Sequence, residues 1–187
     1  MTAWKLRQAV KLLNNGGVIA YPTETVYGLG CDPLNFQAVS HLCGIKQRSL
    51  AKGLILIASR VEQILPYVAV RRSSLAPLTH THKIPTSWII PASEYCPAWL
   101  RGLHTGIAVR ITSHPVARQL CDLAGYPLVS TSANLSQHPP ARNPLSIQKC
   151  FSGKIDMIIH DACGQMAPQS VIKDITSGKI IRGHRHS

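Results

Sequence analysis

The chain has 187 residues and a hydrophobic share of 45%, which predict one folded domain over residues 1–187. Its apolar runs fall far short of the ~20 residues that span a bilayer, and its N-terminus lacks the apolar segment of a signal peptide. We therefore expect a cytoplasmic protein without membrane contact. Its net charge of +12 attracts polyanions and favours contact with a nucleotide or RNA, although a role in solubility alone remains open.

The first half of the chain alternates between helical and strand patterns. Leu6, Val10 and Leu13 recur at helical spacing, and Asn35 is suited to cap a second helix. The predicted elements are a helix over residues 4–14, a strand over 18–21, a polar loop over 22–25, a helix over 36–45, a basic loop over 46–52 and a strand over 54–58.

The second half contains more strands at closer spacing. Ser113 and Pro115 suit the start of a helix that ends near Gly125, and Asn143 begins another. Strands that alternate with helices predict an α/β fold, and the short spacing near the C-terminus predicts that part of the sheet is antiparallel. The predicted strands cover residues 88–90, 107–111, 128–130, 157–160, 171–175 and 179–182.

Metal-binding and disulfide patterns are weak in this sequence. The six cysteines form no C-x-x-C pair, so we expect free thiols. His80 and His82 lack further close ligands, and a zinc site is not expected there.

A phosphate site has to be built without the usual glycine-rich motifs. No G-x-x-x-x-G-K-[ST] occurs, and Gly28 and Gly30 do not complete G-x-G-x-x-G. Lys46 and Arg48 lie two residues apart in a loop, where an ammonium and a planar guanidinium can meet one triphosphate. An ordinary solvated basic loop is the alternative.

Two further segments place polar groups at strand ends. Residues 130–134, which read STSAN, offer hydroxyl and amide groups for phosphate, ribose or an amino acid, or else form a capping turn. Arg110 ends an apolar strand and needs an anionic partner. A substrate carboxylate would serve, and a structural ion pair is the alternative.

Five ordered blocks cover nearly the whole chain. They are AYPTETVYGLGCDP at residues 20–33, KQRSLAKGLILI at 46–57, AVRITSHP at 108–115, STSANLS at 130–136 and DITSGKIIR at 174–182. Together they resemble the YrdC/TsaC family of threonylcarbamoyl-AMP synthases, in its short single-domain bacterial form.

The resemblance implies a twisted mixed sheet with flanking helices around a large basic cavity. It implies a signature tetrad that binds ATP and supports catalysis, formed by Lys46, Arg48, Ser132 and Asn134. It also implies a nucleotide contact from Arg182. The residues implied to hold threonine are Thr23, Arg110, Ser130 and Ser170.

The resemblance also implies a reaction. L-Threonine and bicarbonate form a carbamate, whose oxygen attacks the α-phosphate of ATP and releases pyrophosphate. The product serves threonylcarbamoyladenosine modification of tRNA, through downstream transfer proteins. Mg²⁺ would be held by the ATP phosphates and not by protein side chains, and no tightly bound organic cofactor is implied. Direct binding of tRNA stays open.

Three positions depart from the family pattern. Ile84 replaces a glycine in the stretch 83–87, Gly106 stands where the family tends to have Thr or Ser, and Gln169-Ser170 fits only loosely. If the turn needs a positive φ at residue 84, isoleucine fits poorly and the loop has been rebuilt. These departures keep open an alternative, a non-catalytic RNA-binding or ribosome-maturation module that uses the same cavity.

Overall fold

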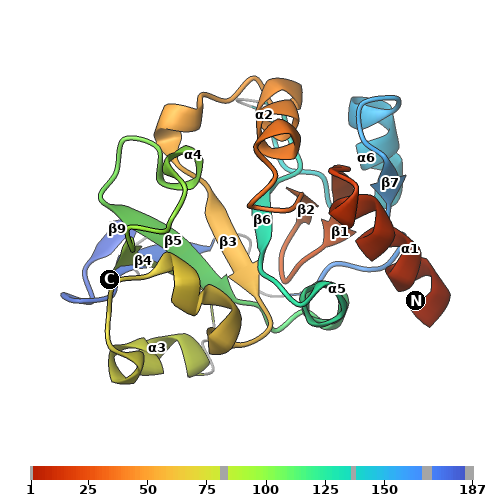
Figure 1. The fold of residues 1–187 in the computed structure, drawn as a ribbon. Helices are drawn as coiled ribbons and strands as arrows, with labels where there is room; N and C mark the ends of the chain where they lie inside the picture. Colours follow the sequence, from red (N-terminus) through yellow and green to blue (C-terminus); the bar gives the residue numbers. More distant parts are fainter. Residues whose placement is uncertain (1, 81–83, 136–137, 166–169, 184–187) are drawn as a thin grey trace.

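The computed structural model describes residues 2–80, 84–135, 138–165 and 170–183 (Figure 1). Nine strands form one mixed sheet in the order β7-β1-β2-β6-β3-β5-β4-β8-β9. Among these strands, β7–β1, β3–β5 and β4–β8 are parallel neighbours, and the other pairs are antiparallel. The strands are β1 (Ile19–Pro22), β2 (Tyr27–Gly30), β3 (Ile55–Ala58), β4 (Thr86–Pro91), β5 (Gly106–Ile111), β6 (Leu128–Ser132), β7 (Met157–Ile158), β8 (Val171–Asp174) and β9 (Ile180–Arg182).

Helices connect most of the strands (Figure 1). The α-helices are α1 (Ala3–Asn14), α2 (Phe36–Ile45), α3 (Ala76–Thr79), α4 (Ala98–Arg101), α5 (Pro115–Ala124) and α6 (Pro144–Phe151), and the 3₁₀ helices are η1 (Leu50–Lys52), η2 (Val61–Tyr67) and η3 (Arg72–Leu75). The predicted α/β class and the antiparallel C-terminal part of the sheet are confirmed.

The two faces of the sheet carry separate apolar cores. On one face, α1 and α5 pack together over Ile19, Ile57 and Leu128. On the other face, residues such as Leu56 and Val109 pack in the larger core with residues of α2, α4, α6 and η2. The first core includes strand residues from β1, β3 and β6 but none from β5, β4 or β8. The cavity of the candidate site, described below, lies on this less covered part of the sheet.

The starts of α2 and α5 test two helix caps that the sequence predicted. The side chain of Asn35 accepts a hydrogen bond from the Ala38 amide at 3.0 Å, so the predicted cap of α2 is confirmed. The predicted cap of α5 by Ser113 is wrong, because no side-chain cap from its own sequence neighbourhood is formed there. Instead Glu24 Oε1, from a distant loop, accepts from the Ser113 amide at 2.9 Å. The buried carboxylate therefore binds amides that immediately precede α5, where a negative charge is favourable.

The helices of the described ranges are also too short or too polar to cross a membrane.

Candidate active site

A cavity of about 570 Å³ lies over the sheet, a size typical of small-molecule sites. Successive residues of a strand face opposite sides, so Ala108 and Arg110 of β5 reach the cavity while Val109 packs in the core. The β1–β2 loop, η1 and the residues around α4 form its walls. Strands β2, β3, β4, β5, β6, β8 and β9 all contribute lining residues.

Cationic side chains predominate among the charged residues that line this cavity. Among the described lining residues, Glu24 is the single carboxylate. The lysine and arginine side chains that oppose it are Arg48, Lys52, Arg101, Arg110 and Arg182. Such a lining favours an anionic ligand, because several cations concentrated in one concave site raise the local concentration of anions.

Most of the predicted site residues meet in this cavity, although they come from elements far apart in the chain. Two members of the predicted tetrad, Lys46 and Asn134, are not among the lining residues and contact Ser132 from behind. The predicted residues that line the cavity are Thr23, Arg48, Arg110, Ser130, Ser132, Ser170 and Arg182.

A tight turn at the end of α2 places the basic pair. Gln47 has a φ of 50°, and it is the only described non-glycine residue with a positive φ. Its amide donates to Gly44 O at 3.0 Å, and the Arg48 amide donates to Cys43 O at 2.9 Å. This pattern is a Schellman motif with glutamine in the position that glycine usually takes. The turn reverses the chain so that Arg48 lines the cavity while Lys46 stays beneath it.

Lys46 is buried and fully engaged by the end of β6. Its Nζ donates to Ser132 O at 2.5 Å, to Asn134 O at 2.7 Å and to Asn134 Oδ1 at 3.3 Å. Burial, with a further contribution from Arg48, lowers the pKa of Lys46 from 10.5 to about 8. Because an ammonium has three donors, these contacts fix the geometry of residues 132–134.

Asn134 completes this arrangement. Its Oδ1 accepts a hydrogen bond from the Ser132 hydroxyl at 2.6 Å, and its Nδ2 donates to His138 O at 2.7 Å. The amide therefore also fixes the turn that follows β6, which is the alternative role that the sequence left open.

Arg48 is held at the opposite wall. Its Nη2 donates to Gly53 O at 2.8 Å, and its Nε is buried without a hydrogen-bond partner in the structure. A buried donor of a charged group that lacks a partner is costly.

Arg110 is held by two side chains to which the sequence analysis gave no role. Its Nε and Nη2 donate to Ser87 Oγ at 3.0 and 2.9 Å, and its Nη1 lies 3.7 Å from Glu24 Oε2. Burial alone would raise the pKa of Glu24, but Arg110 and the Thr112 hydroxyl outweigh it and lower that pKa. The structural ion pair that was the alternative for Arg110 is therefore present. The carboxylate-binding role stays a prediction.

A segment that we call the strap, residues 159–164, fixes the β1–β2 loop from outside. The Tyr27 hydroxyl donates to Asp161 O at 2.6 Å and contacts Ile159 O at 2.9 Å. The Gly164 amide donates to Thr23 O at 2.9 Å. A side chain at residue 164 would meet Glu24 O at 2.6 Å, so the strap approaches the loop as closely as glycine permits.

The three departures from the family pattern have different outcomes. Ile84 does not adopt a positive φ, so the strain that isoleucine would suffer there is absent. Gly106 lines the cavity at the start of β5, where a Cβ atom would meet Ile89 Cγ2 at 2.8 Å and Ile90 O at 2.9 Å. A threonine or serine would not fit without a shift of β4. Lys83 and Gln169 lie outside the described residues.

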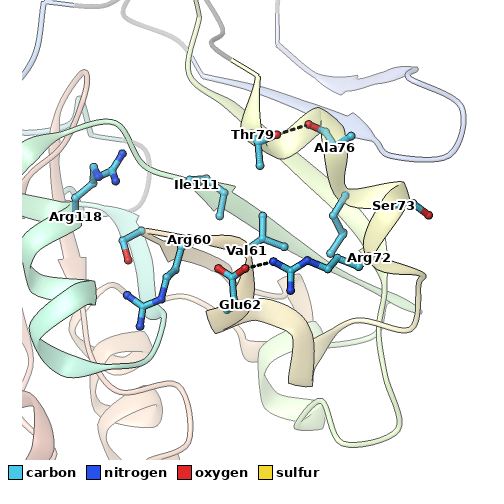
Figure 2. A pocket seen from close by; sticks show the side chains of 11 residues that line it. Arg60, Val61, Glu62, Arg72, Ser73, Ala76, Thr79, Ile111 and Arg118 are labelled. Atoms are coloured by element: carbon cyan, nitrogen blue, oxygen red, sulfur yellow. Dashed lines mark hydrogen bonds and ion pairs between the residues drawn. The ribbon is translucent and has the colours of Figure 1, made fainter.

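A second cavity, of about 430 Å³, lies beyond the ends of β3 and β5 (Figure 2). It is lined by Arg60, Arg72 and Arg118 but by none of the predicted site residues. Two of these arginines already form ion pairs with carboxylates of the protein. Arg72 binds Glu62, as Figure 2 shows, and Arg60 binds Asp122 at 2.9 Å. The first cavity is therefore the better candidate for an active site.

Comparison with known proteins agrees with the blocks found in the sequence. Residues 11–184 match the Sua5/YciO/YrdC family profile, which carries the description "Telomere recombination". The chain belongs to this family. The threonylcarbamoyl-AMP synthase of Methylococcus capsulatus is 45% identical over 183 residues, which cover 97% of this chain and 98% of the relative. That of Coxiella burnetii is 44% identical over 178 residues, covering 95% and 96%.

Solved structures of the family share the fold. P. abyssi Sua5 in complex with L-threonine aligns with a TM-score of 0.88 and 29% identity, over 96% of this chain. The chain spans about half of that protein, 53% of its length. E. coli YciO aligns with a TM-score of 0.83 over 97% of this chain and 89% of its own, and at 24% identity this likeness concerns the fold alone.

Proposed function

We propose that this member of the Sua5/YciO/YrdC family is a threonylcarbamoyl-AMP synthase, which makes threonylcarbamoyl-adenylate and pyrophosphate from ATP, bicarbonate and L-threonine. The observation that carries this proposal is the meeting of seven predicted substrate residues in one cation-lined cavity. The full-length relatives named threonylcarbamoyl-AMP synthase support it. They do not favour the alternative of a non-catalytic RNA-binding module.

In this reaction the nucleophile belongs to the substrate. The threonine amine adds to the carbon of bicarbonate, water leaves, and an oxygen of the resulting carbamate attacks the α-phosphorus of ATP. The bond between the α-phosphorus and its bridging oxygen breaks, and pyrophosphate leaves. The protein then acts by aligning the reactants and by stabilising negative charge, contributions that can reach several kcal/mol each.

The roles proposed for side chains follow their places in the cavity. Arg48 and Arg182 neutralise the phosphates. When ATP binds, the hydroxyl of Ser132 turns its single hydrogen from Asn134 Oδ1 to a phosphate oxygen. Thr23 and Ser130 hold the threonine, whose carboxylate binds Arg110. Ser170 also lines the cavity and adds a further hydroxyl group.

Mg²⁺ would enter with ATP. No group of three or more His, Cys, Asp and Glu residues suited to a metal ion occurs in residues 2–80, 84–135, 138–165 and 170–183. The one lining carboxylate, Glu24, is already engaged. The donor set of the cavity therefore fits an ion held by phosphate oxygens and water, whose charge would offset that of the triphosphate. Transfer of the product to tRNA would fall to partner proteins.

The experiment is pyrophosphate release by the purified chain with ATP, Mg²⁺ and bicarbonate, with and without L-threonine, and with the adenylate identified by its mass. We expect release to depend on threonine and to fall at least tenfold in Arg110→Ala. Arg118→Ala, which removes an exposed arginine from the second cavity, is the matched control and should retain activity. Release without threonine, or no adenylate from the folded protein, would refute the proposal.

A further inference from the structure

We propose that Glu24 and Ser87 are positioning residues that orient Arg110 for the threonine carboxylate. This inference rests on the proposed function and assigns a role to two residues outside the predicted site. Both are buried, with exposed fractions of 4% for Glu24 and 0% for Ser87. Both contact Arg110 from different elements, Glu24 from the β1–β2 loop and Ser87 from β4.

The guanidinium of Arg110 is held along two of its sides. A guanidinium has five N–H donors in a fixed plane. Ser87 Oγ takes the side formed by Nε and Nη2, and Glu24 Oε2 faces Nη1. The outer hydrogens of Nη1 and Nη2 then form the parallel pair that a carboxylate binds in two-toothed fashion. A side chain held at both edges loses little further freedom when the substrate binds.

Glu24 uses its two oxygens for different tasks. Oε1 accepts from the Thr112 hydroxyl at 2.6 Å and from the Ser113 amide at 2.9 Å, and so secures the start of α5. Oε2 faces Arg110. This separation makes the positioning role testable, because glutamine can keep the accepting oxygen at the helix and replace the other oxygen with an NH₂ group. That group would oppose the guanidinium, since both are donors.

The test compares Glu24→Gln, Ser87→Ala and Thr112→Val in the full chain. Steady-state pyrophosphate release gives KM for threonine and for ATP, and thermal unfolding reports the fold. For Glu24→Gln and Ser87→Ala we expect the threonine KM to rise at least tenfold while the ATP KM changes less than threefold. Thr112→Val removes the hydroxyl that donates to Oε1 and accepts from the His114 amide, but it leaves Oε2 facing Arg110. It should lower the unfolding midpoint with less than a threefold change in the threonine KM.

The outcomes separate this inference from the proposed function. An inactive wild-type chain would refute the function itself. With an active wild type, unchanged threonine KM values in Glu24→Gln and Ser87→Ala would overturn the positioning role, as would equal increases in both KM values. If Glu24→Gln does not fold, Ser87→Ala decides, because the Ser87 hydroxyl lies on β4 and contacts Arg110 directly.

Discussion

Replacing Lys46 with methionine measures what the buried ammonium costs. The pKa of Lys46 falls from 10.5 to about 8. At about 1.36 kcal/mol for each pKa unit, its burial costs about 3 kcal/mol below pH 8. Methionine removes this cost but takes the Lys46 donor away from the Asn134 carbonyl oxygen, at about 1–3 kcal/mol. It also takes one of two donors from the Ser132 carbonyl oxygen, which still accepts from the Asn134 amide at 2.9 Å. We therefore expect the free energy of unfolding at pH 7 to change by less than about 3 kcal/mol.

The pH dependence of the unfolding free energy tests the lowered pKa of Lys46 more directly than its value at pH 7. Between pH 8 and pH 10.5 the folded chain has released the Lys46 proton while the unfolded chain still binds it. Stability therefore rises with pH in this window, because the unfolded state binds more protons. The methionine variant lacks this gain. The difference in unfolding free energy, wild type minus variant, should increase by about 3 kcal/mol from pH 7 to pH 10.5.

Urea unfolding of both proteins at several pH values provides the measurement, and the subtraction removes titrations that both share. Pyrophosphate release at pH 7 is followed in parallel. We expect the variant to lose about 100-fold or more in activity while it stays folded, because the turn at residues 132–134 is no longer fixed. A stability difference that does not change between pH 7 and pH 10.5 would refute the depressed pKa and the cost derived from it.

Three further predictions concern other parts of the molecule. In Gly28→Ala the new Cβ would lie 3.3 Å from two side chains in the cavity, so threonine binding should weaken about tenfold with little loss of stability. In Gly30→Ala the new Cβ would lie 2.5 Å from a carbonyl oxygen, so this substitution should cost about 2–3 kcal/mol of stability. Tyr27→Phe releases the strap and should lower the unfolding free energy by about 1–2 kcal/mol. A thiol reagent should modify exposed Cys150 quickly and leave Cys121 intact, because burial raises the pKa of Cys121 to about 12.

Each of these has a direct check. Titration calorimetry with threonine and denaturant unfolding separate the two glycine variants, and equal stability losses would contradict the distances. A Tyr27→Phe protein as stable as the wild type would show that the strap does not depend on this hydroxyl. Mass spectrometry of labelled peptides identifies the modified thiol, and rapid labelling of Cys121 in the folded chain would be inconsistent with its burial.

Sequence patterns located most of the fold because apolar periodicity and caps act locally. The strand β2 was missed, since Gly28 and Gly30 interrupt the apolar pattern that identifies a strand. The short helices α3 and α4 were also missed, because four residues provide too little periodicity to recognise.

The candidate site was predicted less completely than the fold. Linear blocks identified most of the residues that now line the cavity. They could not show that Lys46 lies beneath Ser132, because burial depends on the turn at Gln47. They also gave no role to Ser87, whose contact with Arg110 arises only from the pairing of β4 with β5. Long-range strand pairing is the information that a single sequence lacks.

The alternation of side chains along β5 separates two demands on one segment. Residues on one side determine what the cavity can hold, and residues on the other side determine how well the chain packs. A substitution at Ala108 could therefore alter ligand choice while Val109 keeps the layer beneath unchanged. Because neighbouring positions of β5 separately affect ligand binding and core packing, a substitution on the cavity side can change the ligand and still leave a folded protein.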